Sequence, residues 1–271
     1  MKIAALQMVS GLQPEANLAQ ARQLMEQAVR LGAELVVLPE YFCAMGARDT
    51  DKIAYREAYG SGPIQDFMRQ AARELQLWVV AGTLPLQADD AQHVLNTSLV
   101  YSPQGECVAR YDKIHLFCFD NGREHYAESD VVQAGTQPVV CDVQAQNGET
   151  WRLGLSVCYD LRFPELYRQL SAKGADLLLV PSAFTYTTGQ AHWEVLLRAR
   201  AIENQAYVLA PGQGGVHENG RRTWGHSLLI DPWGEVLALQ ASGMGVVLGD
   251  LNRERMYQVR QQLPALTHRV L

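Results

Sequence analysis

Cys158 is the residue of this chain best placed to act as a nucleophile. It follows an apolar run, Trp151–Val157, that is typical of a buried strand, and it precedes a polar turn after which Pro164 is expected to begin a helix. Backbone N–H groups at such a helix start favour a thiolate and, later in a reaction, an oxyanion. A buried structural cysteine would occupy the same kind of position, so this residue alone leaves both interpretations open.

Glu40 and Lys113 offer complementary chemistry. Glu40 follows a predicted buried strand and Pro39, at the end of a strand where active sites of α/β proteins assemble, and could act as a general base. Lys113 lies in the apolar segment Arg110–Phe117, where a fixed ammonium group could stabilise an oxyanion. An exposed loop carboxylate and a surface lysine at a sheet edge are the alternatives. A base, a cation and a thiol together favour covalent acyl transfer through a thioester.

Other catalytic and metal-binding motifs do not occur in the sequence. It contains no GxSxG, HExxH, Walker A or GxGxxG pattern, and the glycine-rich Gly212–Gly215 is expected to be a loop. His115 or His192 could form a Cys–His dyad with Cys158, but no protease signature surrounds the cysteine. The five cysteines are scattered and include no CxxC pair, which disfavours disulfides and zinc sites and favours a reducing cytoplasm.

The elements that would position these residues alternate between strands and helices. Short apolar runs predict buried strands, and apolar residues at helical spacing predict amphipathic helices. The strands are expected near the start of the chain before Gln7 and over Leu35–Leu38, Trp78–Ala81, Thr97–Tyr101, Trp151–Val157, Leu177–Val180, Tyr207–Ala210 and Ser227–Ile230, and the helices over Glu15–Leu31, Ile64–Leu75 and His192–Glu203. No linker or repeat divides the chain, so we expect one α/β domain over residues 1–271.

Composition excludes several classes of protein. The chain has 271 residues, of which 48% are hydrophobic and 19% charged, and this apolar content is too high for intrinsic disorder. A net charge of −6 disfavours a nucleic-acid-binding protein, which needs a basic surface. No apolar run approaches the roughly 20 residues of a membrane span, and the apolar start is too short for a secretory signal.

Three ordered motifs resemble the signatures of the nitrilase superfamily. They are Leu-Pro-Glu40, Tyr-Asp-Lys113-Ile-His-Leu-Phe and Ser-Val-Cys158-Tyr-Asp-Leu-Arg-Phe-Pro-Glu165, and the similarity extends from Ile3 to about His268. The resemblance implies a four-layer α-β-β-α sandwich that forms a homodimer or a larger homo-oligomer. It also implies hydrolysis of a small amide with no cofactor and no metal.

The resemblance assigns a role to each residue of the motifs. Cys158 would be the nucleophile, Glu40 the general base and Lys113 the oxyanion stabiliser, with the backbone N–H of Tyr159 as a second oxyanion donor. Many members have a second glutamate between the lysine and the cysteine. Glu128 fits that position, and Glu124 is its nearby rival.

The motif around Cys158 is similar to the branch that holds ω-amidases and deaminated-glutathione amidases. Nitrilases proper usually have Cys-Trp-Glu, and carbamoyl-amino-acid hydrolases more often have Cys-Asn-Asp. The segments Pro181–Phe184 and Gly189–Glu203 resemble the deaminated-glutathione amidases, whereas Gly225–Gly234 fits both groups. Gln213-Gly-Gly departs from the Gln-Cys-Gly usual in the amidases.

The substrate that this resemblance implies is deaminated glutathione. It carries a carboxylate at each end, so an arginine near Cys158 is expected. The candidate substrate-binding residues are Arg162, Arg198 and Arg200, with Ala183, Phe184 and Thr185 after a buried strand. For Arg162 a structural ion pair with Asp160 or Glu165 is equally possible. An ω-amidase is the nearest alternative function, another small-amide or carbamoyl hydrolase is a further one, and a non-catalytic binding module of the same fold is the alternative from a different class.

Overall fold

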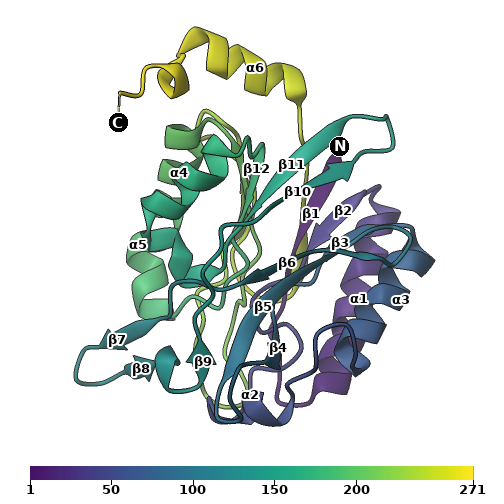
Figure 1. Cartoon of the computed structure of the whole chain (residues 1–271), viewed down its shortest axis with the longest axis vertical. Coiled ribbons are helices and arrows are strands. Elements are labelled where there is room, and N and C mark those ends of the chain that lie inside the picture. Colours follow the sequence, from purple (N-terminus) through teal and green to yellow (C-terminus); the bar gives the residue numbers. More distant parts are fainter. Residues whose placement is uncertain (271) are drawn as a thin grey trace.

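The computed structural model describes residues 1–270, and its framework is two mixed β-sheets (Figure 1). The first sheet has the order β16-β1-β2-β3-β5-β4, and β6 and β9 also pair with β5. Its strands are β1 (Lys2–Gln7), β2 (Leu35–Val37), β3 (Trp78–Val80), β4 (Leu84–Gln87), β5 (Val94–Tyr101), β6 (Cys107–Asp112), β9 (Val132–Gln133) and β16 (Gly245–Asp250). The pairing of β1 with β16 joins segments that are far apart in the sequence.

The second sheet follows chain order from β10 to β15. Its strands are β10 (Val140–Gln144), β11 (Thr150–Leu155), β12 (Leu177–Leu179), β13 (Tyr207–Ala210), β14 (Ser227–Ile230) and β15 (Val236–Gln240). A separate hairpin, β7 (Cys118–Asp120) with β8 (His125–Ala127), projects beside the two sheets (Figure 1).

Helices cover the outer face of each sheet. On the first sheet lie α1 (Pro14–Arg30) and α3 (Pro63–Leu75), and on the second α4 (Pro164–Ala172) and α5 (Tyr186–Asn204). Figure 1 shows the resulting helix–sheet–sheet–helix order, which confirms the predicted α-β-β-α sandwich. The remaining helices are α2 (Asp51–Ala54), α6 (Arg253–Gln262) and the short 3₁₀ turns η1 (Glu128–Asp130), η2 (Cys158–Arg162) and η3 (Ala265–Thr267).

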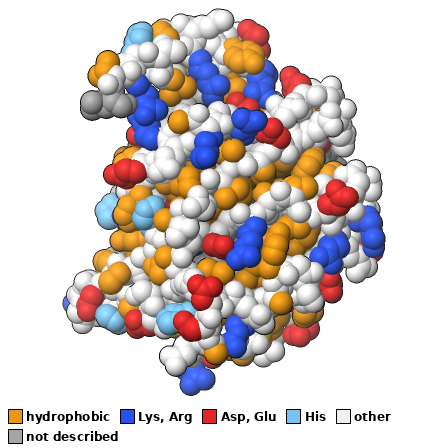
Figure 2. All heavy atoms as spheres, in the orientation of Figure 1, with side chains coloured by type: hydrophobic (Ala, Val, Ile, Leu, Met, Phe, Trp, Pro, Cys, Tyr) orange, Lys and Arg blue, Asp and Glu red, His pale blue; other side chains and the backbone are white. Residues whose placement is uncertain are grey.

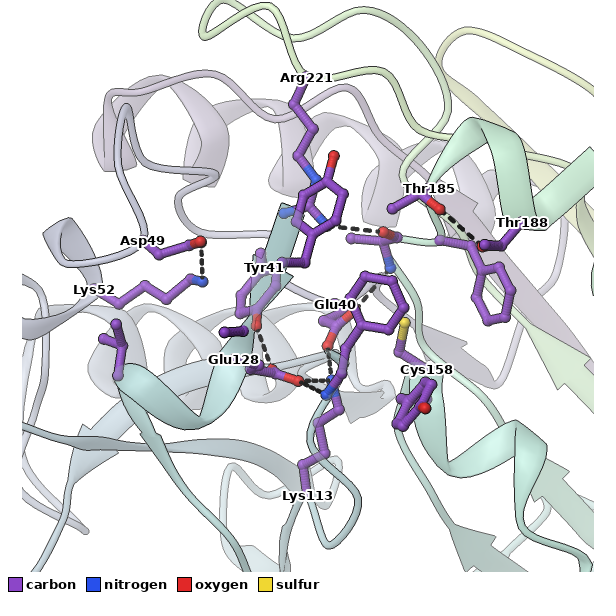
Figure 3. Close-up of a pocket in the computed structure, with 17 residues that line it drawn as sticks. Glu40, Tyr41, Asp49, Lys52, Lys113, Glu128, Cys158, Thr185, Thr188 and Arg221 are labelled. Carbon is purple, nitrogen blue, oxygen red and sulfur yellow. Dashed lines mark hydrogen bonds and ion pairs between the residues drawn. The ribbon is translucent and has the colours of Figure 1, made fainter. Parts of the chain in front are cut away.

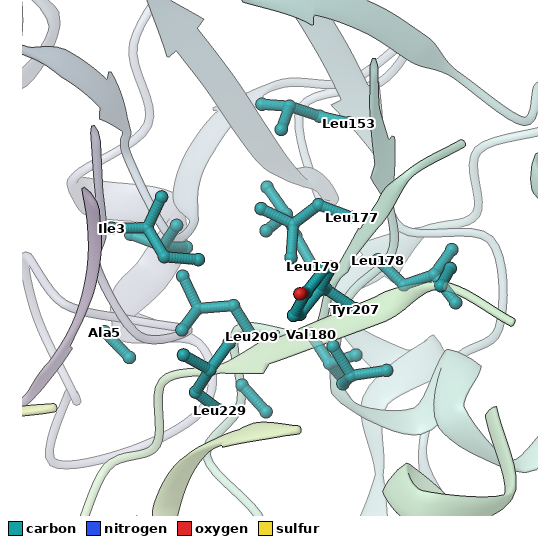
Figure 4. Close-up of a cluster of buried hydrophobic side chains, with 14 of the residues drawn as sticks. Ile3, Ala5, Leu153, Leu177, Leu178, Leu179, Val180, Tyr207, Leu209 and Leu229 are labelled. Carbon is teal, nitrogen blue, oxygen red and sulfur yellow. The ribbon is translucent and has the colours of Figure 1, made fainter. Parts of the chain in front are cut away.

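Alternating side chains of β1 explain why both faces of the first sheet are apolar. Ile3 and Ala5 point toward the second sheet, where they join a cluster that includes Leu209 and Leu229 (Figure 4). Ala4 and Leu6 point the other way and pack with residues of α1 and α3. A strand buried on both faces has no polar side, which accounts for the nearly continuous apolar runs of the sequence.

Every predicted strand and helix occurs in the structure, and two of the differences in boundary affect the site. The helix expected over His192–Glu203 is only the later part of α5, which begins at Tyr186 directly after Thr185. Lys113, expected inside a strand, follows the last residue of β6, although its backbone N–H still donates to Asn96 O at 3.0 Å. The pairing therefore continues one residue past the strand and fixes where the lysine side chain starts.

On the face shown in Figure 2, basic and acidic side chains are interspersed. Within residues 1–270, no helix is long and apolar enough to cross a membrane. The same residues contain no group of three His, Cys, Asp or Glu side chains arranged to hold a metal ion.

Candidate active site

A cavity between the two sheets brings together residues from four strand ends (Figure 3). Glu40 comes just after β2, Lys113 after β6, Cys158 after β11 and Ala183 after β12. Glu128, on η1, lines the same cavity. The structure thus gathers residues that are spread over much of the chain.

Cys158 is held at a sharp turn. Its φ of +48° is in the left-handed region, which is strained for a residue with a side chain. The turn is fixed by Cys158 N, which donates to Pro181 O at 3.0 Å, and by Val157 N, which donates to Asp160 Oδ2 at 2.8 Å. Asp160 is fully buried and also accepts from Tyr111 Oη at 2.7 Å. These contacts aim the thiol into the cavity at the start of η2.

Glu40 is almost completely buried and fully hydrogen-bonded. Its Oε1 accepts from Asn96 Nδ2 at 3.0 Å and from Lys113 Nζ at 2.9 Å, and its Oε2 accepts from Ala183 N at 2.8 Å. These donors come from both sheets, and they leave the carboxylate no freedom to turn away from the cavity.

Lys113 lies between two carboxylates. Its Nζ is 2.9 Å from Glu40 Oε1 and 2.7 Å from Glu128 Oε2, and only 1% of its side chain is exposed. Burial alone would lower the pKa of this lysine, but the charges of Glu128 and Glu40 outweigh it and raise the pKa above its usual value. The ammonium group is therefore a permanent positive charge in the cavity.

Glu128, and not Glu124, is the second glutamate at this site. Its carboxylate accepts from Tyr41 Oη at 2.7 Å and from Phe117 N at 2.8 Å, besides the contact with Lys113. Burial works against its charge, yet the neighbouring Lys113 lowers its pKa to about 2. Glu124 instead accepts from Thr187 Oγ1 at 2.9 Å and does not line the cavity.

The surroundings of Cys158 favour the protonated thiol over the thiolate. Burial raises its pKa well above the usual value, the Glu40 carboxylate raises it further, and Lys113 only partly opposes this. A thiol in that state needs a base within reach before it can attack. Glu40 is the carboxylate that the structure places beside it (Figure 3).

The remaining predicted residues divide into two groups. Tyr159, Ala183, Phe184 and Thr185 line the cavity. Arg162, Arg198 and Arg200 do not line it in the described part of the chain.

The three predicted arginines make contacts outside the cavity itself. Arg162 stacks over Phe184 and Tyr159 and, among residues 1–270, forms no ion pair with Asp160 or Glu165. Arg198 lies in a separate hollow on α5, and its Nε donates to Gly234 O at 3.0 Å. Arg200 is buried, and its guanidinium donates to Leu161 O and Glu203. The last two side chains therefore act in packing α5 against its neighbours.

Sequence reasoning missed several residues of the cavity. Arg221 and Tyr126 line it, as do Lys52 and Asp49, which pair with each other at 2.8 Å. Tyr41, next to Glu40 in the sequence, could have been found by its position. The others lie in loops, on the hairpin or on the short helix α2, where no periodic pattern marks them.

Comparison with known proteins identifies the family. The family model described as carbon-nitrogen hydrolase matches residues 2–261. The chain belongs to the carbon-nitrogen hydrolase family. It is 44% identical over 270 residues to the deaminated glutathione amidase of Synechocystis, with 98% of this chain and 97% of that protein covered. The human deaminated glutathione amidase is 37% identical over 271 residues, which is 98% of this chain and 81% of that protein.

Solved structures of the family share the fold. The Caenorhabditis elegans NitFhit protein superimposes with a TM-score of 0.90 at 38% identity, covering 99% of this chain and 65% of that longer chain. A Saccharomyces cerevisiae member of branch 10 of the nitrilase superfamily gives 0.87 at 28% identity, covering 100% and 97%. The carbon-nitrogen hydrolase fold and the predicted superfamily are both confirmed.

Proposed function

We propose that this carbon-nitrogen hydrolase is an amidase that cleaves deaminated glutathione into 2-oxoglutarate and cysteinylglycine. The observation that carries the proposal is the cavity in which Cys158 faces Glu40 and the Lys113 ammonium group. The 44% identity to a deaminated glutathione amidase over 98% of the chain supports the choice of substrate. That substrate is glutathione in which a ketone replaces the amine of the γ-glutamyl residue.

The reaction begins with proton transfer. Glu40 takes the proton of the Cys158 thiol, and the resulting thiolate attacks the amide carbonyl carbon. The oxyanion that forms is stabilised by Lys113 and by the backbone N–H of Tyr159 at the start of η2. Glu40 then gives its proton to the nitrogen of cysteinylglycine, the C–N bond breaks, and a thioester remains on Cys158.

Hydrolysis of the thioester returns the enzyme to its starting state. Glu40 takes a proton from water, and the hydroxide attacks the thioester carbonyl at the same oxyanion site. The C–S bond breaks, the thiolate recovers the proton, and 2-oxoglutarate leaves. Glu128, whose pKa is lowered to about 2, stays ionised and holds Lys113 in place throughout.

We further propose a homo-oligomer in a reducing cytoplasm. Val195 and Ile202 project from α5 with 62% and 48% of their surface exposed, and they line a hollow on its outer face. Apolar side chains gathered on one helix favour an interface with a second copy. The five cysteines are free, which suits a reducing compartment.

A side-by-side assay with deaminated glutathione and 2-oxoglutaramate tests the substrate. With the Cys158→Ala variant as the blank, we expect a higher kcat/KM for deaminated glutathione. A preference for 2-oxoglutaramate would replace the proposal by an ω-amidase. No turnover of either substrate, together with no reaction of Cys158 with iodoacetamide, would favour the non-catalytic binding module.

A further inference from the structure

Arg221 is a cation of the cavity that has no carboxylate partner among residues 1–270. The other cations that line the cavity are already paired with carboxylates: Lys113 with Glu40 and Glu128, and Lys52 with Asp49. The group around Lys113 carries two negative charges and one positive charge, so an anionic substrate is repelled there unless another cation receives it.

The surroundings of the Arg221 guanidinium leave hydrogen-bonding capacity unused. Its Nη2 donates to Ala183 O at 3.3 Å, and its Nη1 has only a 4.0 Å contact with Met45 Sδ. Its Nε is buried and, within the described residues, has no hydrogen-bond partner. The guanidinium lies 5.3 Å from the centre of the Tyr126 ring, which limits its movement. The Nη1 and Nη2 groups therefore have N–H bonds left to donate, and a bound carboxylate would accept them as charge-assisted hydrogen bonds.

Ala183 sets the distance between Arg221 and the reacting centre. Its N–H donates to Glu40 Oε2 at 2.8 Å, and its carbonyl accepts from Arg221 Nη2 at 3.3 Å (Figure 3). Standard bond lengths across one residue then place Arg221 Nη2 at most about 10 Å from Glu40 Oε2. The five-carbon 2-oxo acyl arm of the substrate spans about 5 Å, and one hydrogen bond at its far end extends the reach to about 8 Å.

We propose that Arg221 binds the carboxylate at the far end of the 2-oxo acyl arm and thereby selects acidic amides. The inference rests on the proposed function and identifies the residue that recognises the carboxylate of the 2-oxo acyl arm. When the amide carbon is next to Cys158, the arm runs along Ala183 and its carboxylate meets Arg221. Arg221 is a specificity residue and takes no part in proton transfer.

Two substrates that differ only in this carboxylate test the proposal. In 4-oxopentanamide a methyl group replaces the carboxylate of 2-oxoglutaramate, and the rest of the molecule is the same. We expect Arg221→Gln to lower the ratio of kcat/KM for 2-oxoglutaramate over 4-oxopentanamide by about 100-fold, because a buried charged hydrogen bond is lost. Most of the change should be in KM, and Arg221→Lys should recover part of the ratio.

The neighbouring arginine provides a matched control. Arg222 is exposed and stacks on Tyr186, with its guanidinium carbon 3.5 Å from the ring centre. Arg222→Gln removes the same charge from the same loop, and we expect it to keep the wild-type ratio. Binding of 2-oxoglutaramate to Cys158→Ala protein, measured by calorimetry with and without Arg221→Gln, gives a second readout that does not depend on turnover.

The outcomes separate this inference from the proposed function. A wild-type enzyme that prefers the acidic substrates, with an Arg221→Gln variant that keeps the preference, would overturn the inference alone. Equal losses of kcat/KM for both amides would mean that Arg221 acts only by holding the backbone of Ala183 in place, which would also overturn the inference. A loss confined to deaminated glutathione would assign Arg221 to the cysteinylglycine carboxylate instead. A wild-type enzyme without preference for acidic amides would overturn the proposed function and the inference together.

Discussion

The strained backbone at Cys158 and the burial of its thiol both bear on how this residue attacks the substrate. The left-handed turn directs the sulfur into the cavity, and the raised pKa favours the neutral thiol, so that a base such as Glu40 is needed to form the thiolate. We expect Cys158→Ala to abolish turnover and Cys158→Ser to reduce it nearly to zero, because an alkoxide is far harder to form near pH 7. Rates of amide hydrolysis check this, and a serine variant with the wild-type rate would contradict the thioester mechanism.

The single positive charge of Lys113 is expected to serve both catalysis and the stability of the fold. Lys113→Met should lower kcat by ~10²–10³, as expected for a lost oxyanion donor. It should also destabilise the fold by about 3–5 kcal/mol, because Glu40 and Glu128 are left buried without their cation.

A double variant separates the two effects of Lys113. Lys113→Met leaves two buried carboxylates without a cation, and adding Glu128→Gln removes one of them. The urea midpoint of the double variant should therefore be higher than that of Lys113→Met, while kcat stays low. Recovery of activity along with stability would mean that the lysine acts only by holding the fold.

At the scale of elements, the end of β2 is fitted closely against Gly82. This glycine has a φ of +35°, and a Cβ there would collide with the backbone of Pro39, one residue before Glu40. Gly82→Ala should therefore lower the free energy of unfolding by about 1–3 kcal/mol and reduce kcat by displacing Glu40.

The turn glycine Gly148 is the control for this substitution. Its φ is +86°, but nothing lies within 4 Å of a Cβ built there. Gly148→Ala should cost about 1 kcal/mol of stability from backbone strain and leave kcat unchanged. Urea unfolding and kcat measured on both variants check the comparison.

The loop that carries Arg221 is attached through His217. Its Nδ1 lies 2.9 Å from Ser10 O and its Nε2 lies 2.8 Å from Thr223 Oγ1, and burial lowers its pKa below 6.5. A lowered histidine pKa means that the unfolded chain binds the proton more readily. The resulting stability is fully present above pH 6.5 and is lost as the pH falls below it.

His217→Gln tests this pH dependence. The free energy of unfolding of the variant should differ from that of the wild type most at pH 8, and the difference should shrink toward pH 5. Urea unfolding at several pH values measures it. A difference that stays constant with pH would show that the protonation of His217 does not contribute.

The sequence predicts the parts of the site that depend on local pattern. Glu40 and Cys158 each follow an apolar run and Lys113 lies next to apolar residues, and the carboxyl ends of strands are where active sites of this class assemble. Arg221 could not be predicted in this way, because it reaches the cavity from a loop whose path depends on contacts with Ser10 and Ala183. Arg198 and Arg200 lie on the predicted helix, but the sequence does not determine which side of the helix faces the cavity.

At the scale of the whole molecule, α5 is the helix that we expect to form the interface between copies. If the proposed oligomer forms through α5, Val195→Asp should convert it to monomers, since the substitution places a charge in an apolar contact. Leu31→Asp, at an exposed position after α1, should leave the assembly intact. Light scattering coupled to size-exclusion chromatography distinguishes them, and an assembly that survives Val195→Asp would place the interface elsewhere.

Because β1 pairs with β16, the first sheet can be completed only after nearly the whole chain has been synthesised. All other strands of the first sheet lie before residue 134, whereas β16 spans Gly245–Asp250. One edge of β1 therefore stays open while the entire second sheet is synthesised, and an open strand edge can pair with other chains. A nascent chain that stops before residue 245 would carry that exposed edge permanently, so the final strand protects the first from aggregation.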